Sequence, residues 1–499
     1  MKSYEYYLNK LKKKIDNNDK FIIVTILISS IINYLYLLTH NCLSHDGLFN
    51  GPIYQSGEWE MALGRPMLIF IDKLRGGLVT SSIIFFVGLI CICLTMMLIK
   101  RIFKIDKKAL LFLLSILLVS FPTIADGALY IYCFDGYCIS MLFATLSAFL
   151  ITKRKYILSI FFIVCSLSLY QAYISLTVSL IVVYFILQLL DGKGSIKEIV
   201  KSIFVVFLGM ISYFLCLKVG MSILNRSLAD YKGADSIGLN MFFDIPRNIF
   251  KCYNDFFSYL FGNNILLNSY FKRNIYNLII LFIMALVIIF RMIKLKKIQS
   301  LFVVFGLLFI PISICIMDLI ATDTNIICLT SIGFYSLYVL AILVIDRYSY
   351  FNLFKNVCVI VFGVLIFTLF LSDNAEFMAR QDVHNNFYYN TSIALNKAVL
   401  LDEYSDDMDW MFNSIYYYSS SLNKMSLGFV SIQNESYNNF RGLEGIRIFY
   451  ERYFGKRINL VDYDKYFKII NTSEYKSMKI GDVKIIDNVI VVKTSDFNY

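Results

Sequence analysis

Long runs of apolar residues constrain this chain more than any other feature of its sequence. A helix that crosses a bilayer needs about 20 mostly apolar residues, because lipid offers no hydrogen-bond partner to an exposed backbone group. About eleven segments meet this criterion, near residues 21–39, 81–99, 109–125, 137–151, 156–172, 174–190, 202–222, 275–290, 300–320, 328–345 and 355–372. Since 58% of the residues are hydrophobic and only 17% are charged, a water-soluble globular protein is excluded. The sequence predicts an all-α polytopic membrane domain over residues 21–372.

Lysine and arginine are concentrated in alternate gaps between the predicted spans. Cytoplasmic loops of membrane proteins retain positive charge, so this alternation indicates the orientation of the chain. The basic segments are residues 1–20 and the loops "KRIFKIDKK", "TKRK", "DGKGSIKEIVK" and "RMIKLKKIQ". We therefore expect a cytoplasmic N-terminus, and an odd number of spans then places the C-terminus outside. The net charge of +11 reflects this orientation signal, and no nucleic-acid partner is expected.

Three long segments fall on the external side of this predicted topology, namely residues 40–80, 220–274 and 373–499. Long loops often carry function, so we expect the chemistry on this side. The last segment contains a helical pattern in "EGIRIFYERYFG" and strand patterns in "MSLGFVSI", "RINLVDY" and "VKIIDNVIVVKTSD", with a turn at Asp487-Asn488. It predicts a small extracytoplasmic α/β domain at the C-terminus.

The cysteine pattern and the absence of nucleotide-binding motifs argue against several classes of enzyme. Most of the 11 cysteines lie within predicted spans, where cysteine acts as a small apolar residue. Cys42, Cys133, Cys138 and Cys252 lie near the predicted outer face and are candidates for a disulfide. The sequence has no Cys/His set typical of zinc, no glycine-rich nucleotide-binding motif and no G-x-S-x-G. An enzyme that works outside the cytoplasm has no supply of nucleotide sugars, so an activated sugar used there would have to arrive on a lipid carrier.

An amphipathic pattern occupies the second half of the first external loop. Its apolar positions recur every three or four residues, at Trp59, Leu63, Met67, Phe70 and Leu74. Its charged positions, Glu58, Arg65 and Asp72, fall seven residues apart. We expect two short helices on the outer membrane surface, because Pro66 favours the first turn of a second helix after Gly64-Arg65. Gly76 and Gly77 should end this second helix.

This loop, together with "FPTIADGALYIYCFDGYCISMLFATLSAFL" and "SLSLYQAYISLTVSLIVVYFI", resembles the type II glucosyltransferase family. That family is related to phage serotype-converting (O-antigen glucosyltransferase) enzymes and belongs to the C-type glycosyltransferase superfamily. Its markers in this chain are the arrangement of Asp46, Gly64 and Arg65 and the pair Tyr170-Gln171. The resemblance covers most of the membrane part, whereas the C-terminal segment matches only in general character.

The resemblance implies a membrane enzyme with a lipid-borne donor. It implies transfer of a hexosyl, and specifically glucosyl, unit from a polyprenyl-phosphate sugar to a surface polysaccharide or its lipid-linked repeat unit. The reaction would occur on the outer face of a bacterial cytoplasmic membrane. A flippase and a synthase of the carrier-linked sugar are the implied partners beside donor, acceptor and bilayer.

The resemblance also implies roles for individual residues. Asp46 matches the acid of the first external loop, where a carboxylate can accept the proton of the acceptor hydroxyl. Arg65 is the nearest arginine for the donor phosphate. Many members of the superfamily have two adjacent acids, whereas this chain has His45-Asp46, so the identity of the base and a divalent metal both stay open. Further candidates for acceptor binding or auxiliary roles are Glu58, Glu60, Asp126, Asp135, Tyr170 and Gln171.

Each candidate also has a structural interpretation. Asp46 is consistent with a solvated loop acid, and Arg65 with a contact to lipid headgroups. Asp126 and Asp135 flank the segment "DGALYIYCFDGY", which we expect to be an external turn that they cap. Glu58 and Glu60 are consistent with a charged interfacial face, and Tyr170-Gln171 with helix packing.

Two other functions fit a polytopic membrane protein of this kind. A transporter or flippase of lipid-linked sugars should have ionisable residues facing a central cavity and related halves, and neither is visible in the sequence. A polysaccharide polymerase or ligase would use the same class of donor on the same face.

Overall fold

The computed structural model describes residues 16–40, 45–51, 53–223, 225, 227–229, 241–261, 271–320, 328–349, 352–412 and 442–493. The helices up to the end of the membrane body are α2 (Asn17–Thr39), α3 (His45–Asn50), α4 (Glu58–Ala62), α5 (Pro66–Arg75), α6 (Ser81–Phe103), α7 (Lys108–Val119), α8 (Pro122–Leu129), α9 (Phe134–Thr152), α10 (Tyr156–Leu167), α11 (Ile174–Leu190), α12 (Ile196–Ile223), α13 (Met241–Phe261), α14 (Phe271–Met292), α15 (Lys297–Ile314), α16 (Ile316–Ile320), α17 (Phe334–Tyr348) and α18 (Asn352–Val399). Three short 3-10 segments, η1 (Ile131–Cys133), η2 (Gln171–Tyr173) and η3 (Cys328–Gly333), precede α9, α11 and α17.

Most of the predicted spans coincide with these helices. Within the described ranges, 9 segments are helical, long and apolar enough to cross a membrane. The two remaining predicted spans, 156–172 and 355–372, fall on the shorter apolar helices Tyr156–Leu167 and Val359–Thr368. The chain is therefore a multi-pass all-α membrane protein, and the count of eleven spans stays a prediction.

The segment between the third and fourth membrane helices differs from the prediction. Pro122 starts α8 after a break in the helix, and α8 continues to Leu129, beyond the predicted end of that span. The short 3-10 segment η1 then leads directly into α9. The expected external turn capped by Asp126 and Asp135 is thus wrong, because both aspartates lie in helices and are buried.

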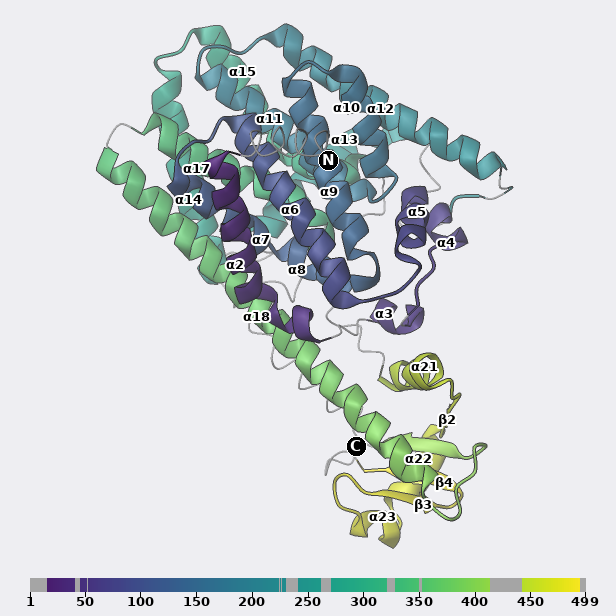
Figure 1. Ribbon diagram of the computed structural model, residues 1–499. Helices are drawn as coiled ribbons and strands as arrows, with labels where there is room; N and C mark the ends of the chain where they lie inside the picture. Colours follow the sequence, from purple (N-terminus) through teal and green to yellow (C-terminus); the bar gives the residue numbers. More distant parts are fainter. Residues whose placement is uncertain are drawn as a thin grey trace, which may run out of the picture.

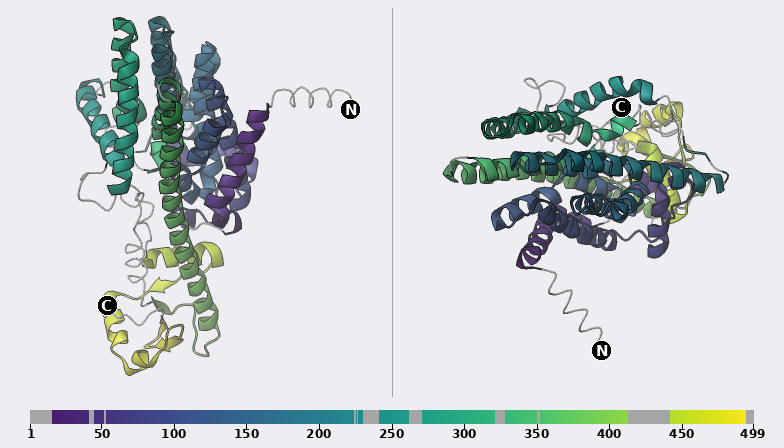
Figure 2. Two further views of the ribbon diagram at one scale, coloured as in Figure 1. Left: turned by 90° about the vertical axis from the view of Figure 1, so that its left-hand side faces the viewer. Right: turned by 90° about the horizontal axis from the view of Figure 1, so that it is seen from above.

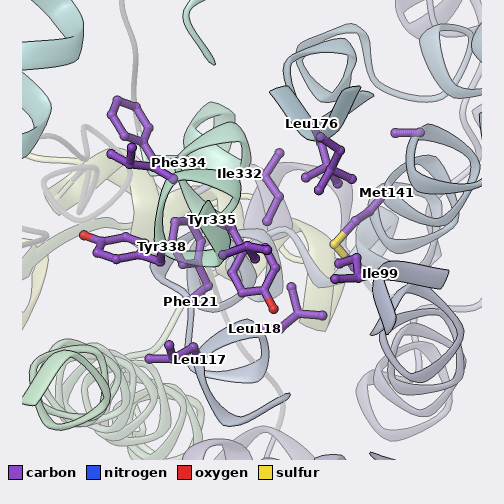
Figure 3. Close-up of a cluster of buried hydrophobic side chains, with 14 of the residues drawn as sticks. Ile99, Leu117, Leu118, Phe121, Met141, Leu176, Ile332, Phe334, Tyr335 and Tyr338 are labelled. Atoms are coloured by element: carbon purple, nitrogen blue, oxygen red, sulfur yellow. The ribbon is translucent and has the colours of Figure 1, made fainter. Parts of the chain in front are cut away.

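The core of the bundle is formed where the most deeply buried helices meet. Figure 3 shows buried side chains from α6, α7, the junction of α7 and α8, α9, α11, η3 and α17, among them Ile99, Leu117, Leu118, Phe121, Met141, Leu176, Ile332, Phe334, Tyr335 and Tyr338. The Tyr335 hydroxyl donates to the carbonyl of Leu114 at 2.9 Å, so this polar group is satisfied inside the apolar core. In contrast, α12, α14 and α15 expose many apolar side chains, as expected of helices that face lipid.

The loops that carry the predicted cytoplasmic charge meet at one end of the bundle, which we call the basic end. Asp19, at the start of α2, forms ion pairs with Lys100 at 2.8 Å and Arg101 at 3.0 Å near the end of α6. Lys107, before α7, pairs with Asp346 of α17 at 2.7 Å. The short helices α3, α4 and α5 lie at the other end of the bundle (Figure 1). This separation is what the positive-inside pattern predicts, although the sidedness itself stays a prediction.

One long helix connects the bundle to the C-terminal region. Figure 2 shows α18, 48 residues long, running along the bundle and continuing past it. It crosses the predicted domain boundary at residues 372/373 without a break. Asn374 still belongs to the bundle, because its side-chain amide donates to Asn33 Oδ1 at 2.8 Å and to the Ser120 carbonyl at 3.3 Å.

Beyond α18 the chain forms a small α/β unit. It consists of β1 (Asp409–Phe412), α21 (Gly442–Phe454), β2 (Asn459–Leu460), α22 (Tyr463–Ile470), α23 (Ser473–Ser477), β3 (Val483–Ile486) and β4 (Val489–Val492). The strand order is β2-β1-β4-β3, with β1 parallel to both neighbours and β3-β4 an antiparallel hairpin. The predicted turn at Asp487-Asn488 is confirmed, because both residues have positive φ (48° and 58°), as a two-residue type I′ hairpin requires. The predicted strand "MSLGFVSI" lies outside the described residues.

Candidate functional site

The amphipathic segment folds as two short helices, as predicted. After α4, Gly64 adopts a left-handed φ of +77°, and Pro66 occupies the first turn of α5. Gly76 caps α5, also with a left-handed φ of +69°. The outward apolar side chains of this segment are largely exposed, with exposed fractions of 57% for Trp59 and 71% for Leu74. Such an exposed apolar face fits a helix pair lying on a membrane surface.

Arg65 lies at the junction of α4 and α5 and contacts the predicted pair Tyr170-Gln171. Its Nε donates to Gln171 Oε1 at 3.4 Å, and its guanidinium carbon lies 4.8 Å from the centre of the Tyr170 ring. The structure thus brings together three of the residues that the sequence singled out. Both contacts are to neutral groups, so they orient the guanidinium without neutralising its charge.

Gln171 and Tyr213 of α12 hold the α4-α5 junction in place. Gln171 Nε2 donates to the Leu63 carbonyl at 2.7 Å, and the Tyr213 hydroxyl donates to the Gly64 carbonyl at 2.7 Å. A Cβ atom on Gly64 would lie 2.6 Å from the Tyr213 hydroxyl and 2.7 Å from Gln171 Nε2. Glycine is therefore required at this position both by its positive φ and by this close approach.

A row of tyrosine rings extends from Tyr54, in the loop between α3 and α4, to Arg65. Ring centroids are 4.7 Å apart for Tyr54 and Tyr132, 6.3 Å for Tyr132 and Tyr130, 6.4 Å for Tyr130 and Tyr137, and 4.5 Å for Tyr137 and Tyr170. These distances are typical of interacting aromatic pairs. The row forms a largely buried wall behind the α4-α5 junction.

Arg75, at the end of α5, has very different surroundings from Arg65. It forms ion pairs with Asp72 at 2.5 Å and with Asp135 at 2.6 Å, and it donates to the Tyr132 carbonyl at 2.6 Å. Burial raises the pKa of Asp72 above its ordinary value, although the backbone amide of Ser56 and the charge of Arg75 oppose this shift. Both aspartates are thus engaged in fixing α5 against η1 and α9.

Asp46 lies in α3, half-buried, beside η1 and the C-terminal unit. Figure 1 shows α3 next to α21, and Phe49 of α3 packs against the apolar core of the C-terminal unit. α3 also contacts η1, which carries Tyr132, and Arg65 contacts the Tyr170 ring. Asp46 and Arg65 therefore border the same tyrosine row from different elements.

The other predicted acids have distinct environments. Glu60 is buried, accepts from the backbone N–H of Gly57 at 2.6 Å, and is hydrogen-bonded to the Tyr54 hydroxyl, so it stabilises the start of α4. Glu58 is exposed on the same helix. Asp126 is completely buried in α8, near Tyr173. Within the described ranges, none of these three acids forms an ion pair or a hydrogen bond with Arg65.

The structure also bears on the predicted disulfide candidates and on the question of a divalent metal. Cys133, Cys138 and Cys252 are free thiols, and Cys42 lies outside the described residues. In the part of the chain that the structure describes, no three histidine, cysteine or acidic side chains cluster in a way that would hold a metal ion. The dependence on a divalent metal therefore gains no candidate ligand set.

The sequence reasoning missed Arg75 and Tyr213 as parts of this region. Arg75 could have been paired with Asp135, because each is a charged residue next to an apolar span and an unpaired buried charge is costly. Tyr213 had no comparable signal, since a single tyrosine inside a membrane helix is common at an aqueous interface.

Comparison with known proteins supports one family. A family model described as glucosyl transferase GtrII matches residues 35–346, which run from the end of α2 to α17 and include α3, α4, α5 and Tyr170-Gln171. No curated protein and no solved structure matches the chain. Because the matched range covers more than half of the sequence and contains most of the membrane helices, the chain belongs to the type II glucosyltransferase family and is a membrane glucosyltransferase.

Proposed function

We propose that this glucosyltransferase takes a glucosyl unit from a polyprenyl-phosphate sugar at the outer face of a bacterial cytoplasmic membrane. The acceptor is a surface polysaccharide or its lipid-linked repeat unit. The region between α3 and the α4-α5 junction forms the reaction site. A flippase and a synthase of the carrier-linked sugar supply the donor.

The contrast between two arginines carries this proposal. Arg75 is neutralised by Asp72 and Asp135, whereas the recorded contacts of Arg65 are a neutral amide and an aromatic ring. Among the residues with described positions, no carboxylate lies within ion-pair distance of Arg65. A cation that is partly withdrawn from water without a counter-charge is well suited to bind an anion. The phosphate of a lipid-borne donor can reach this interfacial position without leaving the bilayer.

The chemistry follows from a carboxylate and a cation on either side of the reacting bond. The acceptor hydroxyl attacks the anomeric carbon, forming the new glycosidic bond while its proton passes to the Asp46 carboxylate. The bond between the anomeric carbon and the phosphate oxygen breaks, and the electron pair stays on the departing polyprenyl phosphate. Arg65 stabilises the negative charge of this leaving group. Tyr170 and Gln171 keep the guanidinium oriented.

The donor can be tested with purified full-length protein in lipid vesicles. The acceptor is polysaccharide from cells that lack the protein, and the donors compared are polyprenyl-phosphate-glucose and a nucleotide-linked glucose. We expect the polysaccharide to gain the mass of one hexose only with the lipid-linked donor. Transfer from the nucleotide sugar alone would contradict the proposal.

A further inference from the structure

A cavity of about 320 Å³ lies at the basic end of the bundle, far along α6 from the α3–α5 region. Its lining comes from the last residues of α6, the last turns of α11 with the loop after it, and the end of α17. Figure 1 shows these helices packed together in the membrane body. The volume is at the lower end of the range of roughly 300–1,000 Å³ typical of ligand-binding pockets.

The cavity is lined by three cations but one carboxylate. The cations are Lys104, Lys193 and Arg347, and the carboxylate is that of Asp191. Asp191 already accepts a hydrogen bond from the Tyr348 hydroxyl at 2.7 Å, and Arg347 donates to a backbone carbonyl, that of Phe103. Within the described ranges, none of the three cations forms an ion pair.

Several other cations at the same end form ion pairs within the protein. Lys100 pairs with Asp16 and Asp19, Lys107 pairs with Asp346, and Arg154 lies 3.4 Å from Glu198. The three cations of the cavity differ from these, because within the described ranges the protein supplies no carboxylate to pair with them. A cavity of this kind favours an anionic ligand with more than one oxygen acceptor.

The cavity also has an apolar wall. Phe103 and Leu187, both buried, line it beside the polar residues. They lie at the ends of α6 and α11, two of the apolar helices that are long enough to cross a membrane. This level of a membrane protein is where phospholipid headgroups and the first carbons of their chains lie.

We propose that this cavity binds the phosphate of an anionic phospholipid headgroup, with the three cations contacting the phosphate and the apolar wall contacting the lipid chains. This site is separate from the proposed donor site and lies at the opposite end of α6. It would attach the bundle to a negatively charged leaflet through one defined lipid.

Thermal unfolding of the full-length protein in detergent tests this proposal. Phosphatidylglycerol, phosphatidylcholine or inorganic phosphate is titrated into the protein, and the unfolding temperature is followed, because a ligand that binds only the folded state raises it. We expect a saturable rise with phosphatidylglycerol and little change with the other two. Equal protection by phosphatidylcholine would contradict recognition of an anionic headgroup. Equal protection by inorganic phosphate would exclude the lipid as the source of the phosphate.

The cavity variant is Lys104→Gln/Lys193→Gln/Arg347→Gln. It should bind phosphatidylglycerol roughly fivefold more weakly for each cation removed, since each contributes about this factor near an anionic surface. Lys104 and Lys193 are exposed, so the double variant lacking only these two cations preserves the fold if loss of Arg347 does not. Unchanged affinity in this double variant would overturn the proposal.

A matched control removes the same amount of charge from the same end. Lys155, Lys197 and Lys296 are exposed lysines of the basic loops and do not line the cavity. The variant Lys155→Gln/Lys197→Gln/Lys296→Gln should retain the affinity for phosphatidylglycerol. If both triple variants lose affinity equally, the attraction is a general effect of the basic surface and the proposed site is wrong.

Discussion

At the residue scale, Arg65 and Arg75 allow donor binding to be separated from folding. Arg65→Gln should weaken use of the lipid-linked donor by about 1.5–3 kcal/mol, the range for hydrogen bonds to charged groups, with little change in stability. Arg75→Gln should instead destabilise the protein by about 3–5 kcal/mol, because it leaves Asp72 and Asp135 buried without their cation. Donor-dependent kinetics and thermal unfolding of both variants measure this difference.

A third variant serves as the control for this pair. Gln171→Glu would place a carboxylate beside Arg65 and neutralise its charge while the arginine remains. It should reproduce the kinetic defect of Arg65→Gln. Normal donor use by Gln171→Glu would mean that the free charge of Arg65 is not what the reaction needs.

Asp46 is the second residue with a defined expected effect. If its carboxylate is the general base, Asp46→Asn should lower the rate of transfer by roughly 10² to 10⁴, while expression and donor affinity stay close to normal. Single-turnover measurements with saturating donor isolate this step. Near-normal turnover by Asp46→Asn would move the role to another acid, with Glu58 as the exposed candidate on α4.

At the scale of elements, the junction between α4 and α5 depends on Gly64. Gly64→Ala should cost at least about 1–2 kcal/mol, because an L-residue is disfavoured at a left-handed φ, and the new Cβ atom would also press on Tyr213 and Gln171. We expect lower transfer activity together with a lower unfolding temperature. Gly220→Ala is a suitable control, since a Cβ atom there meets nothing within 4 Å. If Gly64→Ala and Gly220→Ala have the same transfer activity and the same unfolding temperature, the junction does not depend on Gly64.

The helix pair could be predicted from sequence because its determinants are local. Gly64, Pro66 and Gly76 each act on the backbone at their own position, and so do Asp487 and Asn488 in the hairpin. The ion pair between Arg75 and Asp135 is different, because it exists only where α5 packs on α9. That packing depends on Leu68 fitting against Gly136, where a Cβ atom would lie 2.4 Å from the leucine side chain.

The same distinction explains the errors and gaps of the sequence prediction. The segment between α7 and α9 was expected to be an external turn capped by Asp126 and Asp135, but tertiary packing buries both aspartates in helices. Arg65, Tyr170 and Gln171 were singled out only through the family resemblance, and their contact with one another was not predicted. Nothing in residue spacing brings α5 and η2 together.

At the scale of the whole molecule, the orientation in the membrane is the first property to test. Lys479 follows α23 in the C-terminal unit, Lys155 precedes α10 in a basic loop, and both are exposed. Intact cells carrying Lys479→Cys should react with a membrane-impermeant thiol reagent, whereas cells carrying Lys155→Cys should react only after lysis. The unsubstituted protein gives the background of native cysteines. The reverse pattern would place the α3–α5 region in the cytoplasm and exclude an outer-face reaction.

The length of the continuous helix α18 determines where the C-terminal unit lies relative to the bundle. At about 1.5 Å per residue its 48 residues span about 72 Å, more than twice the roughly 30 Å of a hydrocarbon core. The part of α18 that continues past the bundle carries the C-terminal unit, so its length sets the distance between that unit and the apolar helices. Adding one full turn would raise that unit by about 5 Å with nearly the same facing, whereas adding two residues would swing it by about 200° away from α3. Because Phe49 of α3 packs against the C-terminal unit, a change in the length of α18 would alter how that unit covers α3, the helix that carries Asp46.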